Sequence, residues 1–202
     1  MLTEEYITRQ LQAAYQPGRV DSADGTAGIY EYGTLKCAAV LLPLVHLKDE
    51  WQLVFTRRTE TVEQHKGQVS FPGGGCEPGE STPEATALRE AWEEIGLKPE
   101  DVRLLGRMNE IATITRYRVT PVIGVVPWPY AFRLEHAEVE RLFTIPLEWL
   151  AGRSNWSEQP FTPAGIRHSF QVIRYQPYDG EIVWGITAQI LLNFLKVLGL
   201  EK

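Results

Sequence analysis

Three glutamates at helical spacing are the residues of this chain best placed to do chemistry. Glu90, Glu93 and Glu94 stand at i, i+3 and i+4, so a helix would bring their carboxylates together on one face. Carboxylate oxygens are the ligands that Mg²⁺ and Mn²⁺ prefer, and these ions keep positions open for water and substrate phosphates. The same spacing also fits a solvated acidic face partly balanced by Arg89 and Lys98, and the helix alone favours that interpretation.

The segment that contains these glutamates has clear helix signals. Thr82 offers a hydroxyl N-cap, Pro83 suits the first helical position, and Gly96 is typical of a C-terminal stop. We therefore predict a helix over residues 83–95. The side chains predicted to face the core lie opposite the glutamates and are Ala85, Leu88, Ala91, Trp92 and Ile95.

A glycine-rich run, FPGGG at residues 71–75, directly precedes this helix and favours the metal-binding interpretation. Glycines let a backbone approach a metal ion or a phosphate closely, and we expect the run, with GQVS before it, to be a flexible loop. Loop and helix together resemble the Nudix box, whose pattern is Gly, five residues, Glu, seven residues, then Arg-Glu-apolar-any-Glu-Glu-any-Gly-apolar. Residues 74–97 match it at Gly74, at Glu80 and over the run Arg89-Glu90-Ala91-Trp92-Glu93-Glu94-Ile95-Gly96-Leu97.

The Nudix resemblance implies metal-dependent hydrolysis of a diphosphate. By this resemblance Glu90, Glu93 and Glu94 would bind Mg²⁺ or Mn²⁺, with the carbonyl of Gly73 as a further ligand. Arg89 would orient the carboxylates through charge-assisted hydrogen bonds. Water would attack a phosphorus atom in line, with its pKa lowered by the metal.

The general base of that reaction has two candidates. Glu90 is one, and Glu138 is the other, because Nudix enzymes often place an acid in the segment that follows this part of the fold. Glu138 fits equally well as a surface glutamate before a strand.

One departure from the box pattern lies before the helix. Eight residues separate Glu80 from Arg89, where the pattern has seven. We assign the extra residue to Ser81, in the loop. The register of the helical glutamates is then unchanged, whereas Glu80 could be displaced from its supporting position.

The resemblance extends upstream to the coenzyme A pyrophosphatase branch of the Nudix family. The signature of that branch is Thr-any-Arg-Ser, three residues, Arg, three residues, Gly, three residues, then Phe-Pro-Gly-Gly. Residues 53–74 match it at Thr56, Arg58, Gly67 and the run Phe71-Pro72-Gly73-Gly74. The branch hydrolyses coenzyme A and its derivatives to 3′,5′-ADP and 4′-phosphopantetheine, which is therefore the activity that the resemblance implies.

The substrate-binding residues expected from this resemblance are Arg58, Lys66, Gly67 and Gly74. Glu63 stands where the signature has its second Arg, and this reversed charge would weaken the binding of an anionic ligand. ADP-ribose or a dinucleotide is therefore the alternative substrate. A Nudix domain that binds a nucleotide without cleaving it is a further alternative, but the chain keeps all three box acids.

Elsewhere the pattern predicts a mixed scaffold. We expect a helix over 3–15, a surface loop over 18–34, a short helix after Pro146, irregular strands over 153–181 and an amphipathic helix over 185–199. Strands are predicted at 35–45, 51–57, 102–112, 117–126 and 139–146. Strands between helices predict an α/β/α sandwich with a mixed β-sheet, as one Nudix domain over residues 1–202 in which residues 1–34 are an extension.

Composition limits the partners and the compartment. A net charge of −6 over 202 residues argues against general nucleic-acid binding but not against a small nucleotide substrate. Cys37 and Cys76 form no CxxC and suggest no disulfide framework, so a reducing cytosol is expected. The first residues are polar, and no apolar run is long enough to cross a membrane, so we expect a cytoplasmic protein. The family resemblance also implies a homodimer.

Overall fold

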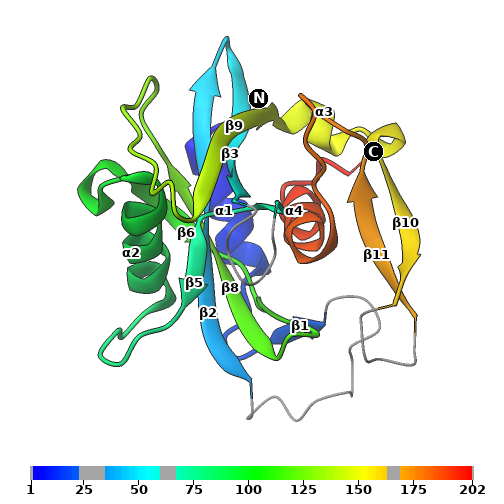
Figure 1. Ribbon diagram of the computed structural model, residues 1–202, viewed down its shortest axis with the longest axis horizontal. Coiled ribbons are helices and arrows are strands. Elements are labelled where there is room, and N and C mark those ends of the chain that lie inside the picture. The colour runs from blue at the N-terminus through cyan, green and yellow to red at the C-terminus, as the bar shows by residue number, and fades with distance from the viewer. Residues whose placement is uncertain (1, 23–34, 60–66, 163–168, 202) are drawn as a thin grey trace.

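A mixed β-sheet with helices on both faces organises the computed structural model of the chain (Figure 1). The structure describes residues 2–22, 35–59, 67–162 and 169–201. Helix α2 (Pro83–Ile95) covers one face of the sheet, and α4 (Gly185–Val197) lies against the other. The predicted α/β/α sandwich is confirmed.

Nine strands form this sheet within the described residues. Its main path runs β1-β7-β8-β2-β3-β4, with β5 beside β2, β6 beside β8 and β9 beside β3. The pairs β1/β7 and β2/β8 are parallel, and the others are antiparallel. The strands are β1 (Val20–Ser22), β2 (Lys36–Leu47), β3 (Glu50–Arg58), β4 (Val69–Ser70), β5 (Gly73–Gly75), β6 (Arg103–Arg107), β7 (Glu110–Ala112), β8 (Tyr117–Val125) and β9 (Val139–Pro146).

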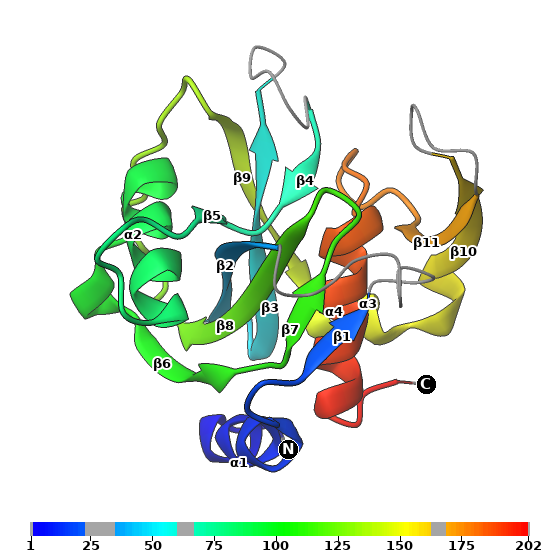
Figure 2. The same ribbon diagram turned by 90° about the horizontal axis from the view of Figure 1, so that it is seen from below.

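The remaining elements pack around the sandwich, at one end of the sheet and on the outer side of α4. Helix α1 (Glu4–Ala14) lies beyond β6 at one end and inserts Ile7 and Leu11 into the core (Figure 2). A two-stranded hairpin of β10 (Trp156–Phe161) and β11 (Phe170–Tyr175) packs on the outer side of α4. Short helices complete the chain: η2 (Pro99–Asp101), α3 (Leu147–Ala151) and η3 (Arg153–Asn155).

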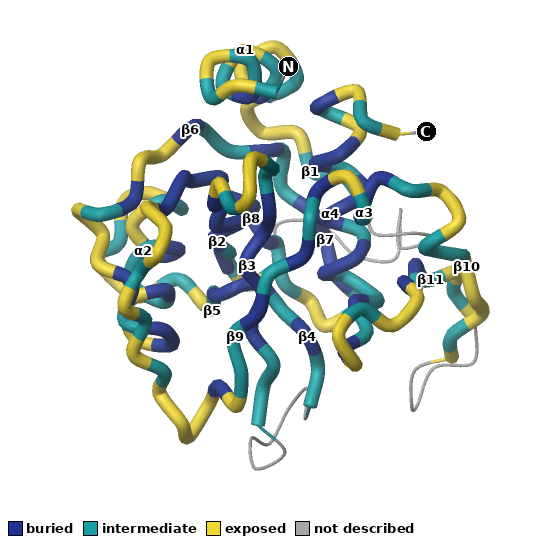
Figure 3. Tube along the Cα trace, turned by 90° about the horizontal axis from the view of Figure 1, so that it is seen from above, coloured by how far each residue is buried: buried dark blue, intermediate teal, exposed yellow. Residues whose placement is uncertain are grey.

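Two apolar cores lie on opposite faces of the sheet, because successive side chains of a strand point to opposite sides. On β2, Leu42 and Leu44 enter the larger core around α4, whereas Ala39 and Leu41 enter the smaller core under α2. Figure 3 shows the buried backbone concentrated in the central strands. The smaller core packs α2, the helix that carries the Nudix-box glutamates, against the sheet.

Helix α2 begins and ends where the sequence predicts, and Ala91 and Ile95 are buried as predicted, but the buried face is rotated toward Ala87 and Glu94. Ala85 is exposed, and Trp92 is 46% exposed, so both predictions were wrong. Ala87, which was not predicted to face the core, packs beside Ala91 against the sheet, because these small side chains allow a closer approach than an indole does. This rotation turns Glu94 inward, with 3% of its surface exposed, rather than leaving it on a solvated face.

Other segments also differ from prediction. The expected loop before the helix is ordered into β4 and β5, because Gly73 brings its backbone against β2, where a Cβ would lie 2.4 Å from the Ala39 carbonyl oxygen. The run 102–112 divides into β6 and β7, with a register shift between Leu104 and Gly106. β1 interrupts the predicted loop 18–34, of which residues 23–34 lie outside the described part. Helix α4 is buried on several faces, since the sheet and the hairpin enclose it.

No helix in the described ranges combines the length and the apolar character that crossing a bilayer requires.

Candidate active site

The buried carboxylate of Glu94 meets the end of β3 and the start of β5. The Gly73 amide donates to Oε2 of Glu94 at 3.3 Å, and Nη1 of Arg58 lies 3.3 Å from Oε1. Nη2 of the same arginine lies 3.6 Å from Oε2 of Glu138. The backbone amide of Thr59 also donates to the Glu138 carbonyl at 2.9 Å. Arg58 therefore lies between two of the predicted acids.

Glu138 reaches this cluster because the loop before β9 docks on the end of α2. The Arg133 amide donates to the Ile95 carbonyl, and the Glu135 amide donates to the Glu94 carbonyl, each at 2.9 Å. These bonds satisfy carbonyls that a helix end otherwise leaves without partners. The C-terminus of the box helix thus holds the loop that delivers Glu138.

Arg89 connects the loop and the helix of the box. Its Nε donates to Glu80 at 2.8 Å, and its Nη1 donates to Glu93 at 2.7 Å. Its Nη2 donates both to Glu90 at 2.8 Å and to the Gly75 carbonyl at 2.9 Å. Such charge-assisted bonds give the guanidinium a fixed position and orient the carboxylates around it.

Glu80 keeps its contact with Arg89 despite the extra residue in the loop. Its Oε2 accepts bonds from the Thr86 hydroxyl at 2.6 Å and from the Glu77 amide at 2.8 Å. Burial would raise the Glu80 pKa, but the hydrogen bonds from Arg89, Glu77 and Thr86 outweigh it and hold the pKa at about 2. The loop accommodates Ser81, which is exposed, without losing this anchor.

The glycines of the predicted site lie close against its acids. A Cβ on Gly74 would stand 2.4 Å from Oε1 of Glu90, so this position leaves no space for a side chain while Glu90 keeps its place. Gly67 adopts a left-handed conformation (φ 62°), and its amide lies 3.4 Å from the Thr59 carbonyl oxygen. Lys66 and Glu63 lie outside the described residues.

Negative charge is in excess around the box helix. Burial is the main cause that raises the pKa of Glu94 to about 8. Arg58 opposes this rise, and the charges of Glu90 and Glu138 contribute to it. Burial also raises the pKa of Glu90, and the adjacent Arg89 only partly offsets this. The two arginines therefore do not fully compensate the carboxylates.

These residues fit a divalent cation by their chemistry. Carboxylate and carbonyl oxygens are the ligands of hard cations, and a cation would supply the missing positive charge. As the side chains lie, no three Asp, Glu, His or Cys side chains of the described ranges converge into a ligand set. Glu93, 53% exposed, is turned toward Arg89, and Glu94 is turned toward Arg58. Binding a metal would require Glu93 and Glu94 to turn toward the ion, while Arg89 keeps its bonds to Glu80, Glu90 and the Gly75 carbonyl.

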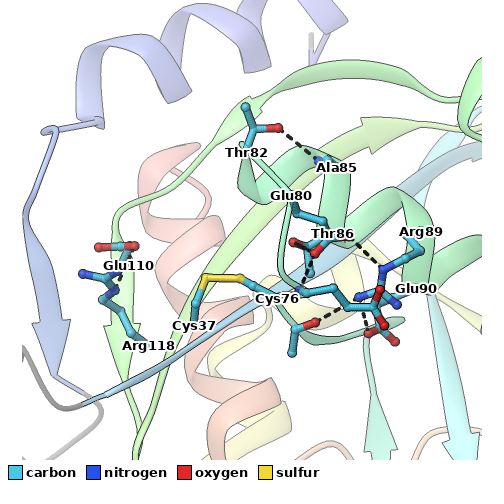
Figure 4. The surroundings of a disulfide bond; sticks show 12 residues. Cys37, Cys76, Glu80, Thr82, Ala85, Thr86, Arg89, Glu90, Glu110 and Arg118 are labelled. Atoms are coloured by element: carbon cyan, nitrogen blue, oxygen red, sulfur yellow. Dashed lines mark hydrogen bonds and ion pairs between the residues drawn. A yellow bond between two sulfur atoms is a disulfide. The ribbon is translucent and has the colours of Figure 1, made fainter.

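Cys37 and Cys76 form a disulfide, so the expectation of unpaired cysteines was wrong (Figure 4). Cys37 lies on β2, and Cys76 directly follows β5. The pairing of these two strands brings residues 39 positions apart in sequence to a Cα–Cα distance of 5.4 Å. The inference of a reducing compartment loses the support it drew from the cysteines.

Comparisons with known proteins place these features in a family. The model of the NUDIX domain matches residues 36–164. The chain is 36% identical over 188 residues to the Yersinia pestis protein named "Uncharacterized Nudix hydrolase NudL". The match covers 93% of this chain and 90% of that protein. The Yersinia pseudotuberculosis protein of the same name has the same identity and coverage. The chain belongs to the Nudix family. The crystal structure of an Enterococcus faecalis MutT/nudix family protein, at 14% identity, agrees in fold with a TM-score of 0.50 over 84% of this chain and 70% of that one.

Membership of the Nudix family establishes the class of reaction. The chain is a pyrophosphohydrolase, acting on the diphosphate bond of a nucleoside diphosphate joined to a second group. Nudix hydrolases generally use divalent metal ions such as Mg²⁺ or Mn²⁺. The acids of this Nudix box are the groups that can hold such an ion here.

Sequence reasoning missed two features of the Nudix box. Thr86 is fully buried and fixes Glu80, yet it was given no role. Its signal was a hydroxyl three residues before Arg89, on the side of the helix that faces the loop. The disulfide was also missed, because the spacing of two cysteines gives no indication of which strands will pair.

Proposed function

We propose that the substrate is coenzyme A or a derivative, cleaved to 3′,5′-ADP and 4′-phosphopantetheine. The main support is that signature residues of the coenzyme A branch adjoin the box acids. Arg58 contacts Glu94, and Gly67 lies beside Thr59, directly after Arg58. The run Phe71-Pro72-Gly73-Gly74 of the signature ends in two glycines that lie against Glu94 and Glu90.

We assign Glu90, Glu93, Glu94 and the Gly73 carbonyl as the residues that would hold Mg²⁺ or Mn²⁺. The bound ion would neutralise the phosphates and lower the pKa of a water molecule. Arg89 keeps Glu90 and Glu93 close together before the ion arrives. Arg58, Lys66, Gly67 and Gly74 are the proposed contacts for the substrate phosphates.

Glu138 is the general base that the arrangement favours. Its side chain remains 50% exposed, and Nη2 of Arg58 lies 3.6 Å from its Oε2. Glu90 is 17% exposed and already bound by Arg89. Glu138→Gln should therefore lower kcat without changing the metal concentration needed for half-maximal rate, whereas Glu90→Gln should raise that concentration. The opposite pattern would assign the base to Glu90.

ADP-ribose or a dinucleotide is the second candidate substrate. The observation in its favour is Glu63, a negative charge where the coenzyme A signature has an arginine. Reversing a charge beside a polyanion weakens its binding. A binding domain without turnover is a third possibility, against which the complete set of box acids counts.

A substrate panel tests these assignments. Coenzyme A, dephospho-coenzyme A, ADP-ribose, diadenosine polyphosphates and nucleoside triphosphates would each be supplied with Mg²⁺ and with Mn²⁺. We expect coenzyme A to be cleaved fastest, and Glu94→Gln or Glu93→Gln to abolish cleavage. Cleavage of ADP-ribose with coenzyme A left intact would overturn the substrate proposal. Tight nucleotide binding without any product would support the binding domain.

We also infer a homodimer in the cytoplasm. The dimer follows from the resemblance to the coenzyme A branch. Light scattering on the purified protein would measure its mass, and the mass of a monomer would contradict the inference. The compartment follows from the class of substrate, since nucleotides are concentrated there, and cell fractionation tests it.

A further inference from the structure

We propose that the Cys37–Cys76 disulfide is a redox-responsive site that holds the catalytic loop, residues 76–82, in position for metal binding. Opening it with a dithiol would loosen the loop and weaken the hold of the box acids on a divalent ion. The inference rests on the proposed metal ligands but does not depend on which substrate is cleaved.

The disulfide joins the catalytic loop to the start of β2, an inner strand of the sheet. Cys37 belongs to β2, which pairs in parallel with β8 along nine consecutive positions, from Lys36↔Tyr117 to Leu44↔Val125. Cys76 is the first residue after β5 and the first residue of the loop. The bond therefore ties a loop to a strand that cannot easily move.

Residues on both sides of Cys76 hold Arg89. The Gly75 carbonyl accepts from Nη2 of Arg89 at 2.9 Å. Glu77 gives its amide to Glu80 at 2.8 Å, and Glu80 in turn accepts from Nε of Arg89 at 2.8 Å. Figure 4 shows the disulfide, Glu80 and Arg89 in one continuous arrangement. Because Arg89 binds the carboxylates of the box helix, a displacement at Cys76 reaches the proposed ligands through two hydrogen-bonded routes.

The backbone pairing beside the disulfide limits what its opening can do. Ala38 pairs with Gly75, and the Cys76 amide donates to the Cys37 carbonyl at 3.1 Å. These bonds do not need the sulfur–sulfur bond, so β5 should stay in place after reduction. Beyond Cys76, the contacts that the loop keeps with described residues run through Glu80 and through Thr82, which caps α2. We therefore expect a graded loss of affinity and not a collapse of the site.

The disulfide is partly accessible to solvent, so a dithiol in solution can react with it. Both cysteines are half-buried, and Lys36, Gly75 and Glu77 next to them are exposed. A thiolate of the dithiol would attack one sulfur, forming a mixed disulfide and releasing the other cysteine as a thiolate that takes a proton. The second thiol of the reagent would then displace the remaining cysteine. The protein gains two electrons and two protons, and the dithiol becomes a cyclic disulfide.

A purely structural disulfide would behave differently on reduction. It would lower the free energy of unfolding but leave the affinity for metal unchanged. The two roles are therefore separated by measurements on folded protein, not by stability. The chain has two cysteines in all, so complete reduction must expose two thiols per molecule, and oxidised protein must expose none.

The test measures Mn²⁺ binding by titration calorimetry, without substrate, on oxidised protein and on protein reduced with dithiothreitol and desalted under argon. We expect the dissociation constant to rise about fivefold on reduction, at the lower end of coupling between sites. By reciprocity, Mn²⁺ should make the disulfide about fivefold harder to reduce, equal to a shift of about 20 mV for two electrons. The double variant Cys37→Ser/Cys76→Ser should have the Mn²⁺ dissociation constant of the reduced protein, and adding the dithiol should not change it. If this variant fails to fold, the reduced natural protein still decides the matter.

Equal Mn²⁺ affinity in oxidised and reduced protein, with equal turnover, would overturn the proposal. Failure of the proposed metal site is visible separately, because Glu94→Gln would then bind Mn²⁺ as tightly as the natural protein. In that event, amide exchange at Glu77 and Glu80 without metal decides whether the loop is held. At least fivefold faster exchange after reduction would support the inference, and unchanged exchange would refute it.

Discussion

Two adjacent glycines of the Nudix box should fail in different ways when each is replaced by alanine. A Cβ on Gly74 would lie 2.4 Å from Oε1 of Glu90, the mobile end of a side chain. A Cβ on Gly73 would lie 2.4 Å from the Ala39 carbonyl oxygen and 2.7 Å from the Val40 Cα, both parts of a central strand. Because carbon and oxygen atoms normally approach to about 3.3 Å, the neighbour must move by roughly 1 Å in either case.

The consequences follow from which neighbour moves. In Gly74→Ala the Glu90 side chain can rotate away, so we expect a loss of at most about 1 kcal/mol in stability. A catalytic group misplaced by about 1 Å costs on the order of 100-fold in rate, so kcat should fall by that factor. In Gly73→Ala the backbone of β2 or β5 must shift, and the free energy of unfolding should fall by about 3 kcal/mol.

Urea denaturation and product release at saturating Mg²⁺ measure the two quantities on the same preparations. The neighbouring variants act as controls for each other, since both add one methyl group to the same strand, β5. A Gly74→Ala protein with natural kcat would refute the placement of Glu90 against the glycine. A Gly74→Ala protein as unstable as Gly73→Ala would show that the Glu90 side chain cannot move aside without a shift of the β5 backbone.

Three further predictions concern stability. Reducing the Cys37–Cys76 disulfide, which spans 39 positions, should lower the free energy of unfolding by at most about 4 kcal/mol. Urea denaturation curves with and without a dithiol measure this loss. Identical curves would show that the bond does not form in solution. Glu80→Gln should be less stable at neutral pH by up to about 3 kcal/mol, because the folded pKa of about 2 lies below the unfolded value near 4.5. That contribution is complete above the unfolded pKa and disappears as the pH falls toward 2, so a difference independent of pH would contradict it. At pH 9, above the Glu94 pKa of about 8, Arg58→Met should cost about 2 kcal/mol of unfolding free energy, because it leaves the ionised Glu94 without its counter-charge. Glu94→Gln in the same protein should restore part of the loss. A double-mutant cycle in urea measures this coupling, and purely additive losses would argue against the pair.

The elements that depend on neighbours in sequence could be read from the residues themselves. Helix α2 runs from Pro83 to Ile95, as predicted, because a Thr hydroxyl, a proline and a left-handed glycine act on the backbone within one turn. The spacing of the three box glutamates follows from that helix. Strand β9 likewise begins and ends at the predicted residues.

What the tertiary structure decided is the direction in which each of these groups points. Sequence periodicity placed Trp92 on the core face and Glu94 on the opposite face, but close packing of Ala87 and Ala91 on the sheet leaves Trp92 exposed and Glu94 buried. The position of Glu138 beside Arg58 depends on a loop that docks on the carbonyls at the end of α2.

The disulfide shows the same limit most clearly. Residues 37 and 76 meet only because β5 pairs with β2, and no local pattern encodes that pairing. By itself, the sequence of this protein predicted the class of reaction and the candidate residues for it, since caps and motif spacing act locally. Only the tertiary structure decided which of those residues are buried, paired or tied to the sheet, because these properties arise from contacts between distant segments.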